Sequence, residues 1–326
     1  MANLPELSTK QSVENIRYLS KDGNITYYQL RSGVLSVTTS YNNKVIFEKK
    51  SGTQYHVTAS HEMKKTLIEV IDKFHGDYNI LKNSEIFLGD YGETKTISIG
   101  RGITPRFHLN GAWISYYDIE NRKIYIKNST ALTKSFTIDV ANKTNPFFQP
   151  SVVVLNPEVF LFTDINSQGV MGIMKYMTAE QKIYPLVKSP QNGIRLEMCK
   201  KNNALFVGQF SYPTLKRGSS IYKLTVDSSG MSTARDDLYS SSLEDIGNIA
   251  CDVSGNQIYF VKMLDASKKY ATEAAGLDFN TKKVTIMSDL KFVSQIVTMD
   301  SRAFVPFRDK FYILNGEDEK KKPAKN

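Results

Sequence analysis

Short stretches rich in Val, Ile, Tyr, Phe and Thr recur along the whole sequence, separated by Gly, Asn, Asp and Ser. No stretch keeps a helical periodicity over several turns, so the pattern predicts an all-β chain. Four such stretches follow one another closely at 106–109, 113–117, 124–127 and 136–140. Because four consecutive short strands make one blade of a β-propeller, this region predicts a blade.

The same order of strands returns on both sides of this blade. Further sets are expected at 17–48, 56–99, 149–187, 195–226, 248–287 and 295–314. When the first strands are aligned, one polar residue falls in the same place in every set. These residues, called the anchors below, are Arg17, His56, Arg106, Gln149, Arg195, Asn248 and Gln295. Their average spacing of about 46 residues fits a four-stranded blade. We therefore predict a seven-bladed propeller, with six or eight blades as the alternatives.

The two ends of the sequence indicate how the ring of blades is closed. The last set has three strands instead of four, and 4–8 lies about as far ahead of Arg17 as other fourth strands lie ahead of their next anchor. We expect 4–8 to supply the missing outer strand and to close the propeller, which removes an open sheet edge. We expect 1–316 to form a single propeller domain and 317–326 to form a charged, flexible tail.

One blade carries a recognisable motif. Phe162, Thr163 and Asp164 are followed by Gly169 and Ile173. This sequence resembles the repeat of TolB-like and WD40-like propellers, in which a strand ending in Phe-Thr-Asp or Phe-Thr-Ser meets a glycine-containing turn and a strand with Ile. The resemblance covers the architecture of most of the chain and the motif of about one repeat. It implies a rigid platform for interactions, and the TolB-like members are periplasmic.

The anchors predict a binding site for an anion. In a propeller the first strand of each blade lines the central channel, and the residues that follow the anchors are all apolar, so the anchors are expected to face the channel near one mouth. Three arginines, one histidine and three amides would suit a carboxylate or a phosphate. The alternative interpretation is that they bind trapped water or nearby acids.

Four aspartates are candidates for such acids. Asp72, Asp118, Asp164 and Asp265 each follow the second strand of a set, on the side of the anchors. An aspartate at the start of a turn accepts hydrogen bonds from the backbone two residues on, so these residues are expected to cap turns. If they neutralise the arginines instead, the predicted anion site is weakened.

Catalytic and metal templates are absent from the sequence, and no cofactor is expected. The four histidines, His56, His61, His75 and His108, have no acidic or cysteine partner at the spacing of a metal ligand, and the CxxC, HExxH and GxSxG motifs are missing. The alternative to a binding protein is a propeller hydrolase or lyase with His56 and His108 as acid and base. Glu197 would then be expected in a pocket beside them, whereas a pairing with Arg195 or Arg106 would argue against catalysis.

Two cysteines do not make a disulfide framework. Cys199 and Cys251 lie four and three residues past their anchors, so they are expected to point to opposite sides of neighbouring first strands and to be two free, buried thiols. Residues 1–7 show no secretory signal. An exported protein whose signal peptide has been removed, with a Met placed ahead of the mature sequence, would start in the same way. We favour a periplasmic or secreted location over the cytoplasm.

The formal net charge of +9 permits acidic partners. The positive residues are scattered in pairs such as 49–50, 64–65 and 216–217, which argues against a nucleic-acid surface. No apolar run approaches the length of about 18 residues that a spanning helix needs. The sequence thus predicts a monomeric, non-enzymatic binding or scaffold protein whose partner is a protein, an acidic peptide or a small anionic ligand.

Overall fold

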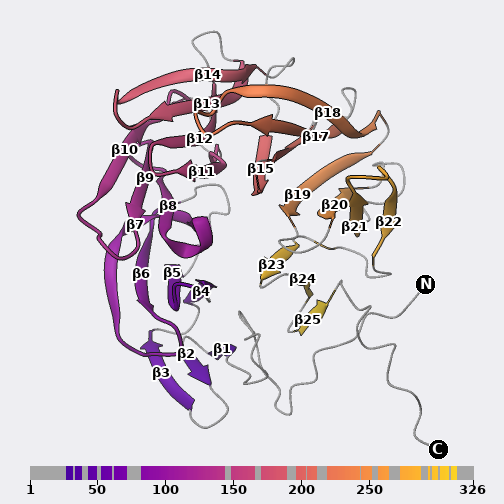
Figure 1. Cartoon of the computed structure of the whole chain (residues 1–326). Helices are drawn as coiled ribbons and strands as arrows, with labels where there is room; N and C mark the ends of the chain where they lie inside the picture. Colours follow the sequence, from indigo (N-terminus) through magenta and orange to yellow (C-terminus); the bar gives the residue numbers. More distant parts are fainter. Residues whose placement is uncertain are drawn as a thin grey trace, which may run out of the picture. The chain divides into compact units, whose positions relative to one another are not determined.

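The structure is a computed structural model of the whole chain (Figure 1). The described residues are 27–31, 34–38, 43–49, 53–60, 62–71, 82–143, 148–165, 170–188, 196–202, 204–210, 219–242, 244–251, 256–263, 272–287, 293, 296–299, 302–307 and 310–313. They cluster into two compact units. The N-terminal unit holds β1–β14 and the turn 228–231, and the C-terminal unit holds β15–β25.

The N-terminal unit contains three antiparallel sheets. The first sheet consists of β1 (Tyr27–Arg31), β2 (Val34–Thr38) and β3 (Asn43–Glu48). The second has seven strands, namely β4 (Gln54–Ser60), β5 (Lys65–Ile71), β6 (Ser84–Asp90), β7 (Thr96–His108), β8 (Trp113–Asp118), β9 (Lys123–Asn128) and β10 (Ser135–Asp139). The third consists of β11 (Val152–Asn156), β12 (Val159–Ile165), β13 (Met171–Met177) and β14 (Lys182–Lys188).

The seven-stranded sheet is two blades that share β7. The first half of this 13-residue strand pairs with β6, and its second half pairs with β8. β7 is therefore the fourth strand of one blade and the first strand of the next. The predicted turn at Asn110 and Gly111 forms the short η1 (Leu109–Gly111), which joins β7 to β8. Leu109, Asn110 and Gly111 all have positive φ angles there.

The C-terminal unit contains two sheets of four strands and one of three. The first consists of β15 (Leu196–Lys201), β16 (Ala204–Gln209), β17 (Ser219–Val226) and β18 (Ser232–Ser241). The second consists of β19 (Asp245–Cys251), β20 (Gln257–Met263), β21 (Thr272–Asp278) and β22 (Val284–Ile286). The third consists of β23 (Val297–Met299), β24 (Arg302–Phe307) and β25 (Lys310–Ile313).

With β7 counted in both of its blades, the described strands form seven consecutive sets, and the predicted all-β propeller architecture is confirmed. β6 and β18 were not predicted. Five consecutive residues of β18 are exposed, and a strand of this kind lacks the apolar alternation by which strands are recognised. The predicted closing strand 4–8 and the tail 317–326 lie outside the described residues.

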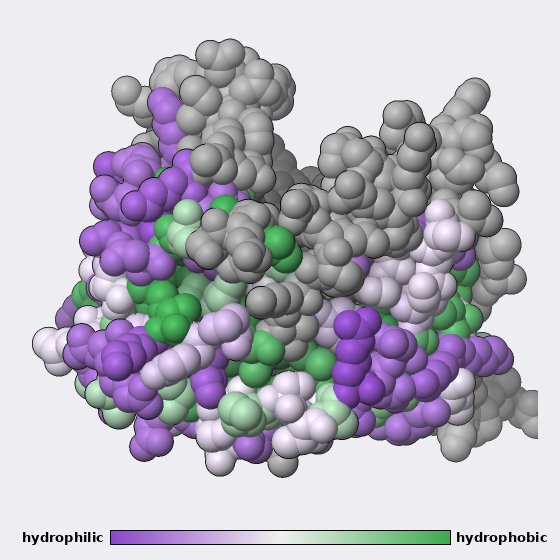
Figure 2. Space-filling model, turned by 90° about the horizontal axis from the view of Figure 1, so that it is seen from above, coloured by the Kyte–Doolittle hydropathy of each residue, from purple (hydrophilic) through white to green (hydrophobic). Residues whose placement is uncertain are grey.

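Each unit has its own core, built from the inward positions of alternating strands. In the N-terminal unit, β5, β6, β7 and β8 contribute a cluster that includes Leu67, Ile86 and Ile114, all fully buried. In the C-terminal unit, Phe206, Ile221 and Phe260 belong to a larger cluster. Burial of each such side chain stabilises the fold by about 1.5–3 kcal/mol. On the face shown in Figure 2, hydrophobic side chains lie in small groups between hydrophilic ones.

A disulfide links two blades of the C-terminal unit. Cys199 on β15 and Cys251 on β19 are bonded, with their Cα atoms 5.7 Å apart, so the prediction of two free thiols is wrong. The reason is a β-bulge in β19. Ile246 pairs with Lys262 and Ile249 pairs with Phe260, which leaves one extra residue on β19. A count of residues from Asn248 assumes a regular strand, whereas the bulge changes the side on which Cys251 emerges.

Within the described ranges, no helix has the length and hydropathy that would let it cross a bilayer.

Candidate functional site

A second β-bulge, in β7, positions the candidate site. Ile103 pairs with Tyr117 and Arg106 pairs with Ser115, so Thr104 and Pro105 together face one residue of β8. Thr104 has a φ angle of 51°, a left-handed conformation that is unusual for a β-branched residue. Bulges re-aim the side chains that follow them, and strained backbone is often found at functional sites. The side chain aimed by this bulge is that of Arg106.

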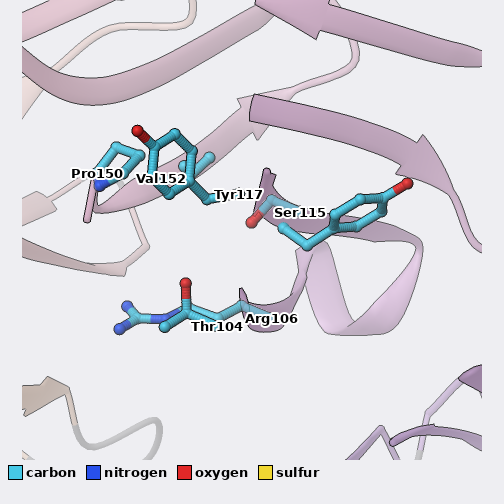
Figure 3. Close-up of a pocket in the computed structure, with 7 residues that line it drawn as sticks. Thr104, Arg106, Ser115, Tyr117, Pro150 and Val152 are labelled. Carbon is cyan, nitrogen blue, oxygen red and sulfur yellow. The ribbon is translucent and has the colours of Figure 1, made fainter. Parts of the chain in front are cut away.

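Arg106 borders a shallow pocket of the N-terminal unit, whose enclosed part has room for about one water molecule. The pocket is lined by Thr104, Arg106, Ser115, Tyr116, Tyr117, Pro150 and Val152. Figure 3 shows Thr104 and Arg106 together on one side, across from Tyr117, Pro150 and Val152. The lining thus combines one guanidinium, several hydroxyl groups and an apolar wall.

A glycine in β7 lets this strand pack closely against two residues of β8 that line the pocket. A Cβ atom at Gly102 would lie 2.7 Å from the ring of Tyr116 and 2.7 Å from the carbonyl oxygen of Tyr117. Such distances are shorter than van der Waals contact, so only glycine allows β7 to approach β8 here. The hydroxyl of Tyr116 donates a hydrogen bond of 2.9 Å to the carbonyl oxygen of Ile99 and fixes the ring.

Arg106 is exposed, and no described residue forms a hydrogen bond or an ion pair with its guanidinium. The described residues that line the pocket include no carboxylate. An arginine in this state carries five hydrogen-bond donors and a full positive charge toward solvent. The arrangement therefore suits an incoming anion.

The two described aspartates from the predicted acid set are engaged elsewhere. Asp118 accepts hydrogen bonds from the backbone and side chain of Asn121 and from the side chain of Asn83, so the turn-capping prediction is confirmed for this residue. Burial would raise the pKa of Asp118, but these hydrogen bonds stabilise the charged form more strongly and lower the pKa. Asp72 and Asp265 lie outside the described residues.

Asp164 holds the connection between β10 and β11. Its carboxylate accepts hydrogen bonds from the backbone of Ala141, Asn142 and Ile165 at 2.6, 3.0 and 2.7 Å. Burial raises the pKa of Asp164, and the three hydrogen bonds only partly oppose this shift. Neither Asp118 nor Asp164 neutralises Arg106.

His108 lies two residues after Arg106, and its Nε2 atom is hydrogen-bonded to the hydroxyl oxygen of Ser115 at 2.7 Å. Burial, assisted by the positive charge of Arg106, lowers the pKa of His108 to about 3. The ring is therefore neutral at physiological pH. It cannot donate a proton as imidazolium there, and its low basicity makes it a poor general base. This environment gives the acid-base alternative no support.

His56 has a partner that the sequence interpretation missed. Its Nδ1 atom lies 3.0 Å from a carboxylate oxygen of Glu69, and the exposed fractions of the two side chains are 57% and 5%. The two residues face each other across the β4–β5 hairpin. Aligning the two strands of that hairpin in the sequence would have revealed the pair.

The other described anchors lie in different surroundings. Gln149 is half-buried and precedes β11, next to Pro150 of the pocket lining. Asn248 lies in the bulge of β19 in the C-terminal unit, and its side-chain oxygen accepts a hydrogen bond of 3.0 Å from the backbone N–H of Ile296. Arg17, Arg195 and Gln295 lie outside the described residues. The convergence of all seven anchors on one channel stays a prediction.

Glu197 also has a connecting role within the C-terminal unit. It is buried, and its carboxylate accepts a hydrogen bond of 3.2 Å from the backbone N–H of Ile249. It thus joins β15 to β19, the strands that the disulfide also joins. Among the described residues, no three His, Cys, Asp or Glu side chains lie close enough together to hold a metal ion.

Comparisons with known proteins identify the fold. No family model and no curated protein matches the sequence. The structure is similar to a prolyl endopeptidase, with a TM-score of 0.59 and 10% identity over 90% of this chain, although the chain spans only 46% of that enzyme's length. It is also similar to the β-propeller domain of the trilobed protease from Pyrococcus furiosus, with a TM-score of 0.54 and 11% identity over 94% of this chain and 95% of that one.

A third similar structure is an uncharacterized protein from Listeria monocytogenes EGD-e, with a TM-score of 0.54 and 13% identity over 96% of this chain and 97% of that one. Identities this low establish the β-propeller fold alone. The function has to be argued from the residues of this chain.

Proposed function

We propose that the protein is a non-enzymatic β-propeller binding module that engages an acidic peptide or a small anionic ligand through Arg106 and the pocket beside it. The observation that carries this proposal is the exposed guanidinium of Arg106, which follows a strained bulge and borders a pocket. The described residues of the pocket lining hold hydroxyl groups and no carboxylate. Charge-assisted hydrogen bonds from a planar guanidinium are among the stronger contacts available to a carboxylate or phosphate.

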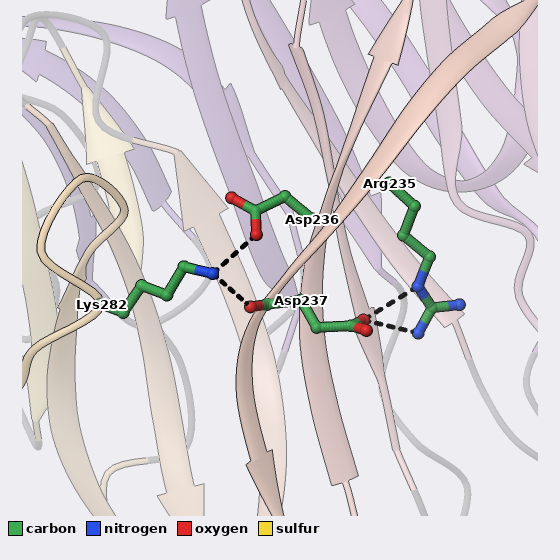
Figure 4. Close-up of polar contacts among 4 residues, drawn as sticks. All are labelled: Arg235, Asp236, Asp237 and Lys282. Atoms are coloured by element: carbon green, nitrogen blue, oxygen red, sulfur yellow. Dashed lines mark hydrogen bonds and ion pairs between the residues drawn. The ribbon is translucent and has the colours of Figure 1, made fainter.

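Charged residues elsewhere in the chain provide a contrast. In the C-terminal unit, Arg235 pairs with Asp237, and Lys282 pairs with Asp236 at 2.7 Å (Figure 4). An anion that approached these cations would have to compete with carboxylates already in place. At Arg106 no such competitor is present among the described residues, which supports binding at this position.

The remaining anchors keep secondary roles in the proposal. Arg17 and Arg195 would add positive charge, and His56, Gln149 and Gln295 would orient the ligand, whereas Asn248 has a structural role. Of the orienting residues, Gln149 has the best support because it adjoins the pocket lining. The side-chain oxygen of Asn248 already binds the backbone of Ile296.

An exported location agrees with this proposal. A disulfide between buried strands persists in oxidising compartments and is uncommon in the cytoplasm. The disulfide therefore supports the proposal that the binding module works in the periplasm or outside the cell.

Binding of a labelled octaglutamate peptide tests the proposal, with octaglutamine as the uncharged comparison. Wild-type protein should bind octaglutamate more tightly at low salt than at high salt. Arg106→Ala should weaken binding about 10- to 100-fold, and the triple replacement of Arg17, Arg106 and Arg195 by alanine should abolish it. Arg101→Ala removes an exposed arginine from the same strand and serves as the matched control. Full binding by a folded triple variant would refute the proposal.

A further inference from the structure

Exposed apolar side chains gather on one outer strand of the N-terminal unit. Among the described residues, six large hydrophobic side chains are exposed, and three of them, Ile183, Tyr184 and Met231, belong to β14 or to the turn 228–231 of the same unit. Met231 is the most exposed of the six, at 55%. Single exposed apolar residues are ordinary, whereas a group of them marks a surface for interaction.

The turn that carries Met231 is held against the blade by two hydrogen bonds. The side chain of Asn156 donates a hydrogen bond of 2.7 Å to the carbonyl oxygen of Ser228. The Nζ atom of Lys175 donates one of 3.2 Å to the carbonyl oxygen of Ser229. The exposed side chain of Met231 is therefore presented by a fixed turn.

Lys175 joins Met231 and Tyr184 into one surface. Its Nζ atom lies 3.9 Å from the sulfur of Met231 and 5.8 Å from the ring centroid of Tyr184. Ile183 and Tyr184 are neighbours on a strand and point to opposite faces, so a segment that runs along the outer edge of β14 can touch both. These four residues and the exposed Lys182 are called the β14 patch below.

The β14 patch carries positive charge that no described carboxylate balances. Neither Lys175 nor Lys182 forms an ion pair with another described residue. The nearby carboxylate of Glu180 accepts a hydrogen bond from the hydroxyl of Tyr184 instead. The outer strand β18 differs, because its exposed arginine is paired with an aspartate of the same strand. The β14 patch thus combines an apolar surface with two ammonium groups that can receive carboxylates.

The outer edge of β14 limits the kind of partner that fits. Among the described strands β14 ends its sheet, so another strand could in principle pair with it. However, Pro185 has no N–H group, and the pairing of β14 with β13 shifts beside it. A partner is therefore held mainly by side chains. A second copy that docked through the same patch would bring like charges together, whereas a partner with carboxylates beside apolar side chains is complementary.

We infer that the β14 patch is a docking surface for a protein segment in which aromatic or aliphatic residues alternate with glutamate or aspartate. The apolar side chains of this segment pack on Ile183, Tyr184 and Met231. Its carboxylates pair with Lys175 and Lys182. None of these five residues lines the pocket beside Arg106, so the surface is an addition to the proposed function and does not depend on it.

NMR titration of protein with labelled isoleucine and methionine methyl groups tests the inference. The probe is the peptide acetyl-Glu-Phe-Glu-Leu-Glu-amide, and two matched peptides carry glutamine or lysine in place of every glutamate. The glutamate peptide should shift the methyl signals of Ile183 and Met231 saturably. It should leave the signals of Ile97 and Ile286 unchanged, which are exposed isoleucines on β7 and β22. Its affinity should exceed that of both matched peptides by about 10-fold or more.

Surface variants separate the contribution of charge from that of apolar contact. Lys182→Gln should weaken binding of the glutamate peptide about 2- to 5-fold. Ile183→Thr combined with Met231→Ser should weaken it about 10-fold, because apolar area is lost. Lys95→Gln and Ile97→Thr change exposed residues of the same types away from β14 and serve as matched controls with unchanged affinity.

Several results would overturn the inference. These are equal affinity for the glutamate and glutamine peptides, equal shifts of all exposed methyl groups, or no shift of Ile183 and Met231. Shifts at these two residues that depend on protein concentration without peptide would identify a second copy as the occupant. Arg106→Ala should bind the peptide with wild-type affinity, and a loss of the shifts in this variant would assign the peptide to Arg106 instead. Binding of octaglutamate at Arg106 is independent of all these results.

Discussion

Two first strands of blades, β7 in the N-terminal unit and β19 in the C-terminal unit, carry the same irregularity in comparable places. Each has one extra residue opposite its second strand, and each bulge adjoins or contains an anchor, Arg106 in β7 and Asn248 in β19. The surroundings of the two anchors then differ. Asn248 binds the backbone of Ile296, and the disulfide lies three residues further on at Cys251. Arg106 has no partner among the described residues and faces a pocket.

The comparison teaches that an aligned polar residue does not have one fixed role. In β19 the polar side chain satisfies a backbone N–H group of the next blade, a contact that contributes about 1 kcal/mol and avoids an unpaired buried donor. In β7 the bulge instead holds Thr104 in a strained conformation and leaves a charge exposed. The bulge in β7 costs stability, whereas the contact made from the bulge in β19 adds stability. This difference is expected if the bulge in β7 belongs to a binding site and the bulge in β19 does not.

The largest expected effect concerns the disulfide that joins β15 to β19 in the C-terminal unit. Replacement of Cys199 and Cys251 by serine should lower the free energy of unfolding by about 4 kcal/mol, since the bond closes a long loop in the unfolded chain. Urea unfolding of wild-type and variant protein measures this loss. Octaglutamate binding by the folded variant should stay unchanged, and a parallel loss of binding would show that the two regions are not independent.

The next effect is a pH dependence that arises beside Arg106. The pKa of His108 is lowered from 6.5 to about 3 in the folded protein, so the unfolded chain takes up a proton below pH 6.5 that the folded protein does not. The stability contributed by neutral His108 is complete above pH 6.5 and is lost as the pH falls toward 3. We expect a loss of about 1–3 kcal/mol between pH 7 and pH 4 because the ring is partly exposed.

His108→Gln measures this contribution. The variant keeps a polar group near Ser115 but cannot titrate, so its unfolding free energy should fall less steeply with decreasing pH than that of the wild type. Identical slopes in the two proteins would contradict the neutral state assigned to His108.

Asn248→Ala should lower the free energy of unfolding by about 1–2 kcal/mol because the backbone N–H of Ile296 loses its acceptor. Asn248→Asp retains an acceptor oxygen and is the matched control, with a smaller expected loss. A stability unchanged in Asn248→Ala would remove the structural role that distinguishes this anchor from Arg106.

A smaller effect is expected at the strained bulge. Thr104→Asn places a residue that tolerates the left-handed region at a φ angle of 51°, so the variant should be about 0.5–1 kcal/mol more stable than the wild type. It should also bind octaglutamate less well, because the pocket lining changes. Thermal unfolding and a peptide titration on the same preparation measure both quantities. A destabilised variant would argue against strain at this position.

The propeller architecture could be predicted because propeller strands repeat at nearly constant spacing, and repeats survive the loss of any single motif. The missed strand β18 lies on the outside of its blade, where exposed residues such as Arg235 and Asp236 replace the apolar alternation. The shared strand β7 was predicted as two separate short strands because the glycines and Pro105 in its middle resemble a break.

The site could be predicted only in part. Alignment of the repeats selected Arg106, but Thr104, Ser115 and Tyr117 enter the pocket through the bulge, and sequence periodicity does not reveal a bulge. The same limit explains the wrong prediction for Cys199 and Cys251, whose separation depends on the bulge in β19. The pairing of His56 with Glu69 depends only on hairpin register and was within reach of sequence reasoning.

The most direct measurement compares octaglutamate affinity and unfolding free energy in Arg106→Gln and Asn248→Ala. The account predicts that Arg106→Gln loses about 10- to 100-fold in affinity while its unfolding free energy changes by less than about 0.5 kcal/mol. For Asn248→Ala it predicts an unchanged octaglutamate affinity and a loss of about 1–2 kcal/mol in unfolding free energy. Retained affinity together with a clear loss of stability in Arg106→Gln would contradict it.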